Sequence, residues 1–377
     1  MKRNIAILLG MLMLLSFTAC AKEKKVGTWE QKLEKAEEFG VVPEEYKAIV
    51  EGDLLNGLRI AGYAGFDGRF LTDEFVEDGR EIALYDSFGK LLAKHFIPTD
   101  ELGYRYVDLL LATSDGGFIY AIDADVASDA NGGVLVTPTQ IFKCGADGSV
   151  EWTAETSGLI VKDIRRAFEK NDAYYFFGEY SDLPAGGYDH IVMLKLGLDG
   201  KELRQNTVSG SDFDSLRWVD ETETGFTLHV NSQSRDGDFF KLKKENAPYT
   251  GRYFVVKTDL ELEEKDVARG KTDYCDRWYY SAGTLKGENV EQNRTMKDIP
   301  GYVKLVIDNG DTYLVVSQNN TGVFERTPPT VSAIWYYSET VYTVFDRDGK
   351  LIARRAYDSS PDWDLKLKAF NSAWYQE

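Results

Sequence analysis

The sequence predicts an all-β protein, a β-propeller of four-stranded antiparallel blades, and three observations carry this prediction. Runs of alternating apolar residues, the period of a β-strand, recur from Tyr46 to Tyr357. Tight turns rich in Asp and Gly separate many of them, as at Ser114-Asp115-Gly116-Gly117 and Ala146-Asp147-Gly148. Tyr and Phe number 22 and 20, an abundance typical of β-rich chains. Four-stranded units that cannot bury both faces alone are expected to stack radially.

The same order of strands and turns occurs five times. In the first two repeats the expected strands are 47–50, 58–63, 81–85 and 91–96, then a short strand after Asp108, 118–122, 140–143 and 150–154. In the other three they are 164–168, 174–179, 190–194 and 202–207; 216–219, 225–231, 253–258 and 265–268; and 302–307, 312–317, 340–345 and 351–356. Five blades are favoured. Residues 270–298 hold one strand-like run, Trp278-Tyr279-Tyr280, and leave a sixth blade as an open alternative.

The N-terminus has the pattern of an export signal over residues 1–19. Lys2 and Arg3 precede an apolar run, residues 5–15, that is too short to span a bilayer as a mature helix. The sequence Thr18-Ala19-Cys20 resembles a bacterial lipoprotein processing site, which implies that Cys20 carries a lipid after cleavage. The match departs from that family at Phe17, where a smaller aliphatic residue is usual, and an ordinary secretory cleavage site is the alternative.

Residues 20–43 are predicted to form a tether and a short helix, ahead of a propeller domain over 44–377. Thr28-Trp29-Glu30-Gln31 has capping-box spacing, and apolar residues follow at helical intervals as far as Phe39. Gly40 then ends the predicted helix.

Charge and cysteine content limit the partners. The net charge of −18 repels phosphate backbones, so no nucleic acid is expected as a ligand. With Cys20 lipidated, Cys144 and Cys275 remain. Two separate thiols are the favoured interpretation, and a Cys144–Cys275 disulfide stays open because nothing in the sequence gives their distance.

A family resemblance lies in the spacing of the repeat. Asp108, then Asp115-Gly116-Gly117-Phe118, then Lys143, Asp147-Gly148 and Trp152 look like the repeats of secreted bacterial propeller proteins. The pattern recurs with losses in the other repeats. The resemblance implies the propeller fold and is nearly silent on function, since this architecture carries many unrelated activities.

Candidate chemistry is sparse. His95, His190 and His229 stand alone, so a zinc site is not expected. An oxygen-rich stretch, residues 123–133, could offer oxygen ligands to Ca²⁺ but lacks the spacing of an EF-hand loop, and loop formation is the favoured explanation. No cofactor is predicted.

Four acids stand at the start of the predicted innermost strands and invite comparison with propeller glycoside hydrolases, which use a pair of carboxyl groups near the axis. These acids are Asp108, Asp163, Asp214 and Asp298. A residue repeated in each blade is expected to bond backbone N–H groups, whereas a catalytic pair should break the repeat. They are therefore predicted to be structural.

Connection length alternates along the chain. The turns from first to second and from third to fourth strand are expected to be tight, whereas the expected connections 64–79, 124–138, 181–189, 233–251, 318–337 and 269–298 are long. Strand parity places the long ones on one face, where binding residues usually sit. Aromatic residues there are the predicted ligand contacts: Trp278, Tyr279, Tyr280, Trp335 and Tyr336. Packing of the loops against the ring is an equal alternative for these residues.

These observations favour a lipid-anchored extracytoplasmic propeller, on the cell surface or the periplasmic side, that acts as a binding or scaffold module for a protein or glycan ligand. Its membrane contact would be the lipid on Cys20. Two alternatives remain: a carbohydrate-active enzyme that uses the inner-strand carboxylates, and a subunit of an envelope assembly complex.

Overall fold

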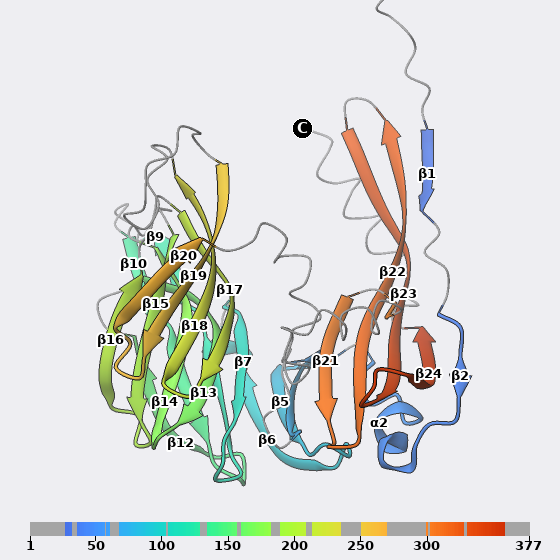
Figure 1. Cartoon of the computed structure of the whole chain (residues 1–377), viewed down its shortest axis with the longest axis horizontal. Helices are drawn as coiled ribbons and strands as arrows, with labels where there is room; N and C mark the ends of the chain where they lie inside the picture. The colour runs from blue at the N-terminus through green and yellow to red at the C-terminus, as the bar shows by residue number, and fades with distance from the viewer. Residues whose placement is uncertain are drawn as a thin grey trace, which may run out of the picture. The chain divides into compact units, whose positions relative to one another are not determined.

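The computed structural model describes residues 27–31, 36–56, 58–60, 68–102, 105–128, 134–156, 160–181, 189–208, 213–234, 250–269, 299–300, 302–327 and 330–358. These residues fall into two units, which we describe separately. The larger unit covers 36–318 and 340–357 and holds the propeller (Figure 1). The smaller unit holds β1 (Gly27–Gln31) and the segment 319–339.

Five blades of four antiparallel strands form the propeller ring; four are separate four-stranded sheets, and the fifth is part of a six-stranded sheet. Blades one and two are β3 (Arg59–Ile60), β4 (Phe70–Val76), β5 (Gly79–Tyr85) and β6 (Leu91–Pro98), then β7 (Val107–Ala112), β8 (Phe118–Ile122), β11 (Gln140–Cys144) and β12 (Val150–Glu155). Blades three and four are β13 (Ile160–Lys170), β14 (Ala173–Ser181), β15 (Asp189–Gly197) and β16 (Glu202–Val208), then β17 (Phe213–Thr222), β18 (Gly225–Ser234), β19 (Thr250–Asp259) and β20 (Glu264–Arg269). Blade five is β21 (Tyr302–Asp308), β22 (Thr312–Thr327), β23 (Thr330–Asp346) and β24 (Leu351–Asp358). The predicted fold class and the favoured count of five blades are confirmed.

The first blade corrects the prediction. Residues 47–50, expected as its inner strand, form the helix α2 (Lys47–Val50), and the inner strand is β3. The expected long connection 64–79 contains β4, so the link between β4 and β5 is a tight one at 77–78. The run at Phe70 was missed because Asp73 interrupts its apolar pattern. That carboxylate is buried and paired with the buried Arg80, a contact that only the fold reveals.

The predicted N-terminal helix is also displaced. Gly27–Gln31, expected to open a helix, is the strand β1, which pairs with β22 from Gly27↔Arg326 to Gln31↔Gly322. The helical residues come later, in the 3₁₀ turn η1 (Glu44–Tyr46) and α2. A further single-turn helix, α3 (Thr99–Leu102), links blades one and two.

Two expected loops contain strands. The segment 124–138 carries the hairpin β9 (Asp125–Ser128) and β10 (Val134–Thr137). The segment 318–337 is an extension of β22 and β23 rather than a loop. Elsewhere the predicted alternation between short and long connections holds for the described strands. The first and second strands are joined by two residues, 171–172 between β13 and β14 and 223–224 between β17 and β18. The second and third strands of the same blades are separated by the longer segments 182–188 and 235–249.

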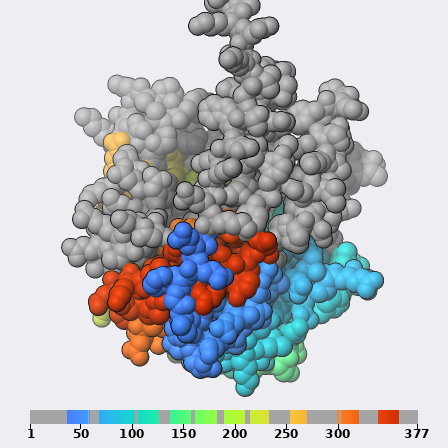
Figure 2. All heavy atoms as spheres, turned by 90° about the vertical axis from the view of Figure 1, so that its right-hand side faces the viewer, coloured from blue at the N-terminus to red at the C-terminus, as the bar shows by residue number. Residues whose placement is uncertain are grey.

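The N-terminal part of the propeller unit closes the ring. The strand β2 (Phe39–Gly40) pairs with β24 at Phe39↔Arg354, so the outer edge of blade five gains a strand from the other end of the chain. Tyr46 and Ile49, both 0% exposed, pack in one apolar cluster with Tyr342 of blade five and Phe70 of blade one. Figure 2 shows these N-terminal residues, in blue, lying against the red C-terminal strands.

Polar contacts hold the same segment. The backbone N–H of Leu55 donates to the hydroxyl of Tyr342 at 3.0 Å, and that hydroxyl donates to Asp53 Oδ1 at 3.1 Å. The hydroxyl of Tyr46 is hydrogen bonded to the hydroxyl of Thr312, the first residue of β22 in blade five, with 2.9 Å between the two oxygen atoms. The segment is therefore a wedge between blades five and one, and we call residues 39–56 the N-terminal wedge.

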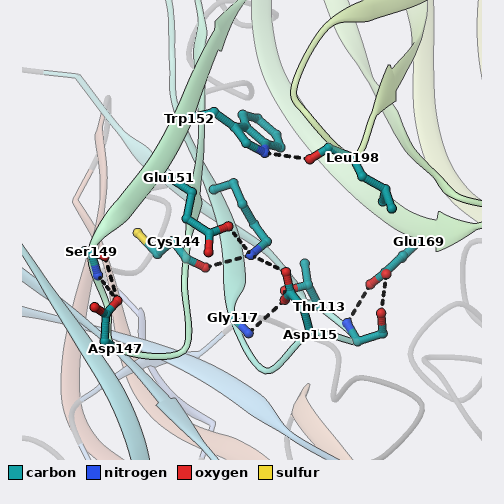
Figure 3. A network of polar contacts seen from close by, with 12 residues as sticks. Thr113, Asp115, Gly117, Cys144, Asp147, Ser149, Glu151, Trp152, Glu169 and Leu198 are labelled. Carbon is teal, nitrogen blue, oxygen red and sulfur yellow. Dashed lines mark hydrogen bonds and ion pairs between the residues drawn. The ribbon is translucent and has the colours of Figure 1, made fainter.

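The repeated motif forms a network at the tight-turn end of blade two (Figure 3). Lys143, 1% exposed, contacts Asp115 at 2.9 Å, Glu151 at 3.0 Å and the carbonyl of Cys144 at 3.0 Å. Gly117 is required here, because a Cβ at that residue would lie 2.1 Å from the Cys144 carbonyl oxygen. The Lys, Asp and Gly of the motif thus tie the two turns of one blade together.

The same end of the blades carries contacts from one blade to the next. Trp152 Nε1 donates to the carbonyl of Leu198, in the turn of blade three, at 2.9 Å. His95 Nδ1 lies 3.1 Å from the Gly148 carbonyl, and Asn206 donates to the Leu262 carbonyl at 2.8 Å. Gly148 has φ +82° and Leu262 has φ 60°, so Leu262 takes the left-handed conformation that Gly supplies in the other turns. These contacts explain why the turn motif recurs.

Candidate functional site

Three of the five predicted ligand contacts, Trp278, Tyr279 and Tyr280, lie outside the described residues. The predicted lipidation site Cys20, and also Cys275 and Asp298, lie outside them as well. Trp335 and Tyr336 lie in β23, within the smaller unit. Within the ranges that the structure describes, no helix has the length and apolar character to cross a membrane.

The three histidines have structural partners. His95 bonds Tyr120 as well as Gly148, His190 lies 3.1 Å from Asp214 Oδ2, and His229 bonds both Tyr253 and Asp220. In the part of the chain that is described, no three His, Cys, Asp or Glu side chains gather as a metal site would require. Cys144 is a free, buried thiol, and burial raises its pKa to about 12.

The structural role predicted for the inner-strand acids holds for Asp108. Its Oδ2 accepts the backbone N–H of Ile164 at 3.1 Å, so the inner strand of blade two is bonded to the inner strand of blade three. Ile164 directly precedes a β-bulge in β13. An equivalent bulge follows Leu109 in β7 and Leu216 in β17, which gives the inner strands a common register.

A denser polar group lies at the joint between blades three and four, and we call Asp163, Arg165 and Glu179 the inner-edge cluster. Asp163 on β13 and Glu179 on β14 stand directly opposite each other. Arg165 is the bulged residue, and its guanidinium donates to Asp163 Oδ2 at 3.0 Å and to Glu179 Oε2 at 3.1 Å. The cation thus bridges two acids that would otherwise repel each other.

The cluster also holds the next blade. Leu216 of β17 donates its N–H to Glu179 Oε1 at 2.6 Å, and its carbonyl accepts from Arg165 at 3.0 Å. Asp163 lies near the start of β13 and Glu179 near the end of β14. This is the end of the ring at which the connections 182–188 and 209–212 leave their strands, and we call it the long-connection end.

Burial sets the electrostatics of the cluster. The side chain of Glu179 is 8% exposed, and desolvation raises its pKa above the ordinary value even though Arg165 opposes the shift. Burial by itself would lower the pKa of Arg165, but the neighbouring Asp163 and Glu179 carboxylates raise it. Asp163 is 31% exposed, and its Oδ1 is a buried atom with no hydrogen-bond partner in the described structure.

Asp214 does not occupy the place that the sequence assigned to it. Counting back from the bulge, Ser215 is equivalent to Asp163, and Asp214 is one residue earlier. A shift of one residue turns a strand side chain to the other face of the sheet. Asp214 is accordingly buried, 0% exposed, with His190 of blade three and Ser232 of its own blade as partners. The expectation that the acids match between repeats is therefore wrong for this residue.

Sequence reasoning missed Glu179, although a signal was present. At its position on the second strand, blades two, four and five have Ala121, Asn231 and Gln318. Among blades two to five, Glu179 is the acid that breaks the repeat. An alignment of the second strands would have shown that Glu179 differs from its counterparts. That alignment depends on the bulges in the first strands, which set the register and cannot be read from strand periodicity.

Comparisons with known proteins concern the architecture. No protein-family model matches the chain, and no curated protein matches it. Among solved structures, a mutant of the Synechocystis apocarotenoid oxygenase is similar over 80% of this chain and 61% of its own, with 12% identity and a TM-score of 0.33. A β-1,3-galactosidase of family GH43, solved with galactodeoxynojirimycin, is similar over 79% of this chain and 93% of its own, with 9% identity and a TM-score of 0.37.

An α-L-arabinofuranosidase from Clostridium thermocellum is similar over 57% of this chain and 72% of its own, with 12% identity and a TM-score of 0.28. The chain thus spans about three fifths (61%) of the length of the oxygenase. Likenesses at these TM-scores carry no argument about what this chain binds or does, which has to come from its own residues.

Proposed function

We propose that this chain is a lipid-anchored, extracytoplasmic propeller that binds a protein or glycan ligand at its long-connection end. The inner-edge cluster carries the proposal. Arg165 holds Asp163 and Glu179 in place, and Leu216 fixes Glu179 from the neighbouring blade. Hydrogen-bonding groups that are positioned before the ligand arrives are what a binding site needs.

The binding experiment uses the full chain in detergent, immobilised and exposed to a glycan panel and to purified envelope-protein fractions. We expect retention of one ligand class, and Arg165→Ala should abolish it because two carboxylates lose their common cation. Lys201→Ala is the matched control, since Lys201 is 81% exposed in a tight turn and pairs with Asp199. Equal retention by Arg165→Ala and the parent would refute a binding role for the cluster.

The anchor has a separate test. Cys20→Ala should move the protein from the detergent phase to the aqueous phase in a partition assay, because the attached lipid would be lost. A variant that still fractionates with membranes as the parent does would show that Cys20 is not the anchor.

A second function, glycoside hydrolysis, is favoured by one observation. Glu179 is an acid that breaks the repeat, its pKa is raised by burial, and a second carboxylate stands opposite it. General acids in glycosidases are carboxyls with raised pKa values, paired with a second carboxylate. The test is hydrolysis of a panel of nitrophenyl glycosides, with Glu179→Gln expected to remove the activity. A parent chain that cleaves none of the panel contradicts this alternative.

A further inference from the structure

The two middle strands of blade five are longer than the strands of the other blades. β22 has 16 residues and β23 has 17, whereas no other strand in the described part of the chain has more than 11. Residues 319–339 of this pair belong to the smaller unit, and we call them the hairpin extension. The strand β1 pairs with β22 there, and Figure 1 shows it beside the ends of β22 and β23.

The direction of β1 brings the N-terminal tether to the tip of the hairpin extension. Gly27 stands opposite Arg326, one residue before the end of β22, so the chain that precedes Gly27 leaves the sheet at the tip. Cys20 is seven residues before Gly27. A chain of that length spans at most about 25 Å in any conformation. A lipid on Cys20 would therefore hold the tip within about 30 Å of the bilayer.

Charge distinguishes the hairpin extension from the rest of the chain. Residues 319–338 contain one acid and one base, Glu325 and Arg326, whereas 28% of the whole chain is charged and its net charge is −18. An anionic lipid surface repels an acidic protein, but it does not repel a stretch without net charge. The tether favours the same approach, because residues 22–25 contain three Lys and one Glu, and basic residues strengthen a lipid anchor on anionic membranes.

The aromatic content of the hairpin extension fits the same partner. Trp335, Tyr336 and Tyr337 follow one another in β23. Trp and Tyr are enriched at the boundary between lipid headgroups and hydrocarbon, because each has an apolar ring and a polar group. Aromatic residues are also common in protein interfaces. The short tether decides between these partners, since it brings lipid to the tip of this hairpin.

We propose that the hairpin extension is the membrane-facing element of this protein, that it contacts the headgroup interface of an anionic bilayer, and that β1 fixes it there by tying the tether to the tip. The inference rests on the proposed lipid anchor at Cys20 and deepens it. A flexible anchor alone would let any face of the protein turn to the membrane, whereas the pairing of β1 with β22 selects one element.

Fluorescence quenching tests this orientation in the full lipidated chain, reconstituted into vesicles of phosphatidylglycerol and phosphatidylcholine. In a Cys275→Ser background, Cys20 carries the lipid and Cys144 is buried, so a bimane label reaches only an added thiol. Lipids with a nitroxide on the headgroup should quench bimane at least threefold more at Arg326→Cys than at Asn320→Cys. Asn320 is the matched position, because it lies in β22 at the same strand parity and about 20 Å further from the tip. Equal quenching, or stronger quenching at Asn320→Cys, overturns the inference.

Proline tests the part that β1 plays. Neighbouring residues of an edge strand direct their N–H groups alternately to the partner strand and to solvent, so Thr28→Pro combined with Trp29→Pro removes at least one bond to β22. Quenching at Arg326→Cys should then fall at least twofold. Thr28→Val combined with Trp29→Tyr is the control, since both substitutions keep strand-forming residues, and it should retain the quenching. Undiminished quenching in the proline variant overturns the inference.

Failure of this inference differs from failure of the anchor. A chain that enters the detergent phase through Cys20 but is quenched equally at the two labelled positions refutes the inference and leaves the anchored binding function standing. A Cys20→Ala variant that fractionates with membranes as the parent does refutes the anchor, and the inference falls with it.

Discussion

The two ends of the blades use charge in opposite ways. At the tight-turn end, the Ser149 hydroxyl lowers the pKa of Asp147, and Lys201 lowers that of Asp199. Both carboxylates are exposed and cap their own turns. At the long-connection end, burial raises the pKa of Glu179. One end stabilises its carboxylates, whereas the other holds a carboxylate where its ionised form is disfavoured.

The two ends therefore differ in what their contacts do: those at the tight-turn end join the blades in a repeated way, and those at the long-connection end depart from the repeat. The tight-turn end repeats its bonds from blade to blade, as with His95, Trp152 and Asn206. The long-connection end departs from repetition at one joint, where Glu179 replaces the expected contact of Asp163. Strained or destabilising arrangements persist in proteins chiefly where function requires them. Four experiments test this contrast.

Lys143 gives the largest expected effect. Lys143→Ala removes a buried ammonium with three acceptors and leaves a cavity, which should lower the free energy of unfolding by about 3 kcal/mol. Lys195→Ala is the control, because Lys195 contacts the largely exposed Glu261 and should cost about 1 kcal/mol. Denaturant unfolding measures both, and equal losses would contradict the role given to the blade-two network.

Gly117 tests the close approach in the same network. Gly117→Ala would place a Cβ 2.1 Å from the Cys144 carbonyl oxygen and should cost about 2–3 kcal/mol by denaturant unfolding. Gly310→Ala is the matched comparison, since Gly310 has φ +87° and no heavy atom within 4 Å of the added Cβ. Its cost should be about 1 kcal/mol, from the backbone alone. The prediction fails if Gly310→Ala is the more damaging.

Trp152 measures the contact from blade two to blade three. Trp152→Phe keeps an aromatic ring over Gly200 and removes the donor to the Leu198 carbonyl, so it should cost about 1 kcal/mol. Thermal unfolding would register this as a small drop in Tm. An unchanged Tm would mean that packing alone makes this joint.

Glu179 gives the smallest and most specific signal, a dependence on pH. Because its pKa is raised in the folded state, its protonated form is favoured there, and the folded chain binds more protons between the unfolded and folded pKa values. The stability that Glu179 contributes through this shift is present below the pKa of the unfolded state and is lost as the pH rises through the pKa of the folded state. Stability of the parent relative to Glu179→Gln should therefore increase as pH is lowered through that window. The opposite slope would place Glu179 with the carboxylates of the tight turns.

The parts of the fold that depend on local chemistry were predictable. Gly116 and Gly148 have positive φ, and the turns that contain them lie where the sequence placed them. The second blade matches its prediction because both turns carry this signal. In blade one, Lys47–Val50 was assigned to a strand although Pro43, Glu44 and Glu45 form a helix start before it.

The candidate site was predictable only in part. Asp108 has the expected role, because it accepts a backbone N–H from the next blade, whereas at the following joint Glu179 makes that bond in place of Asp163. That departure depends on cross-strand register, which is set by bulges after Leu109, Ile164 and Leu216. A bulge has no compositional signature in these strands. The exchange of partners therefore becomes visible only in three dimensions.

The N-terminal wedge has a consequence for the order in which the protein folds. Its strand β2 needs β24, and Arg355 reaches the carbonyl of Phe39 across 316 residues of sequence. During synthesis Tyr46 and Ile49 appear first, and the blade that covers them appears last. Contacts of such long range form slowly because the loop entropy must be overcome before they stabilise anything. The ring therefore cannot close until the last blade is made, and an unfinished chain exposes apolar wedge residues that chaperones would have to shield.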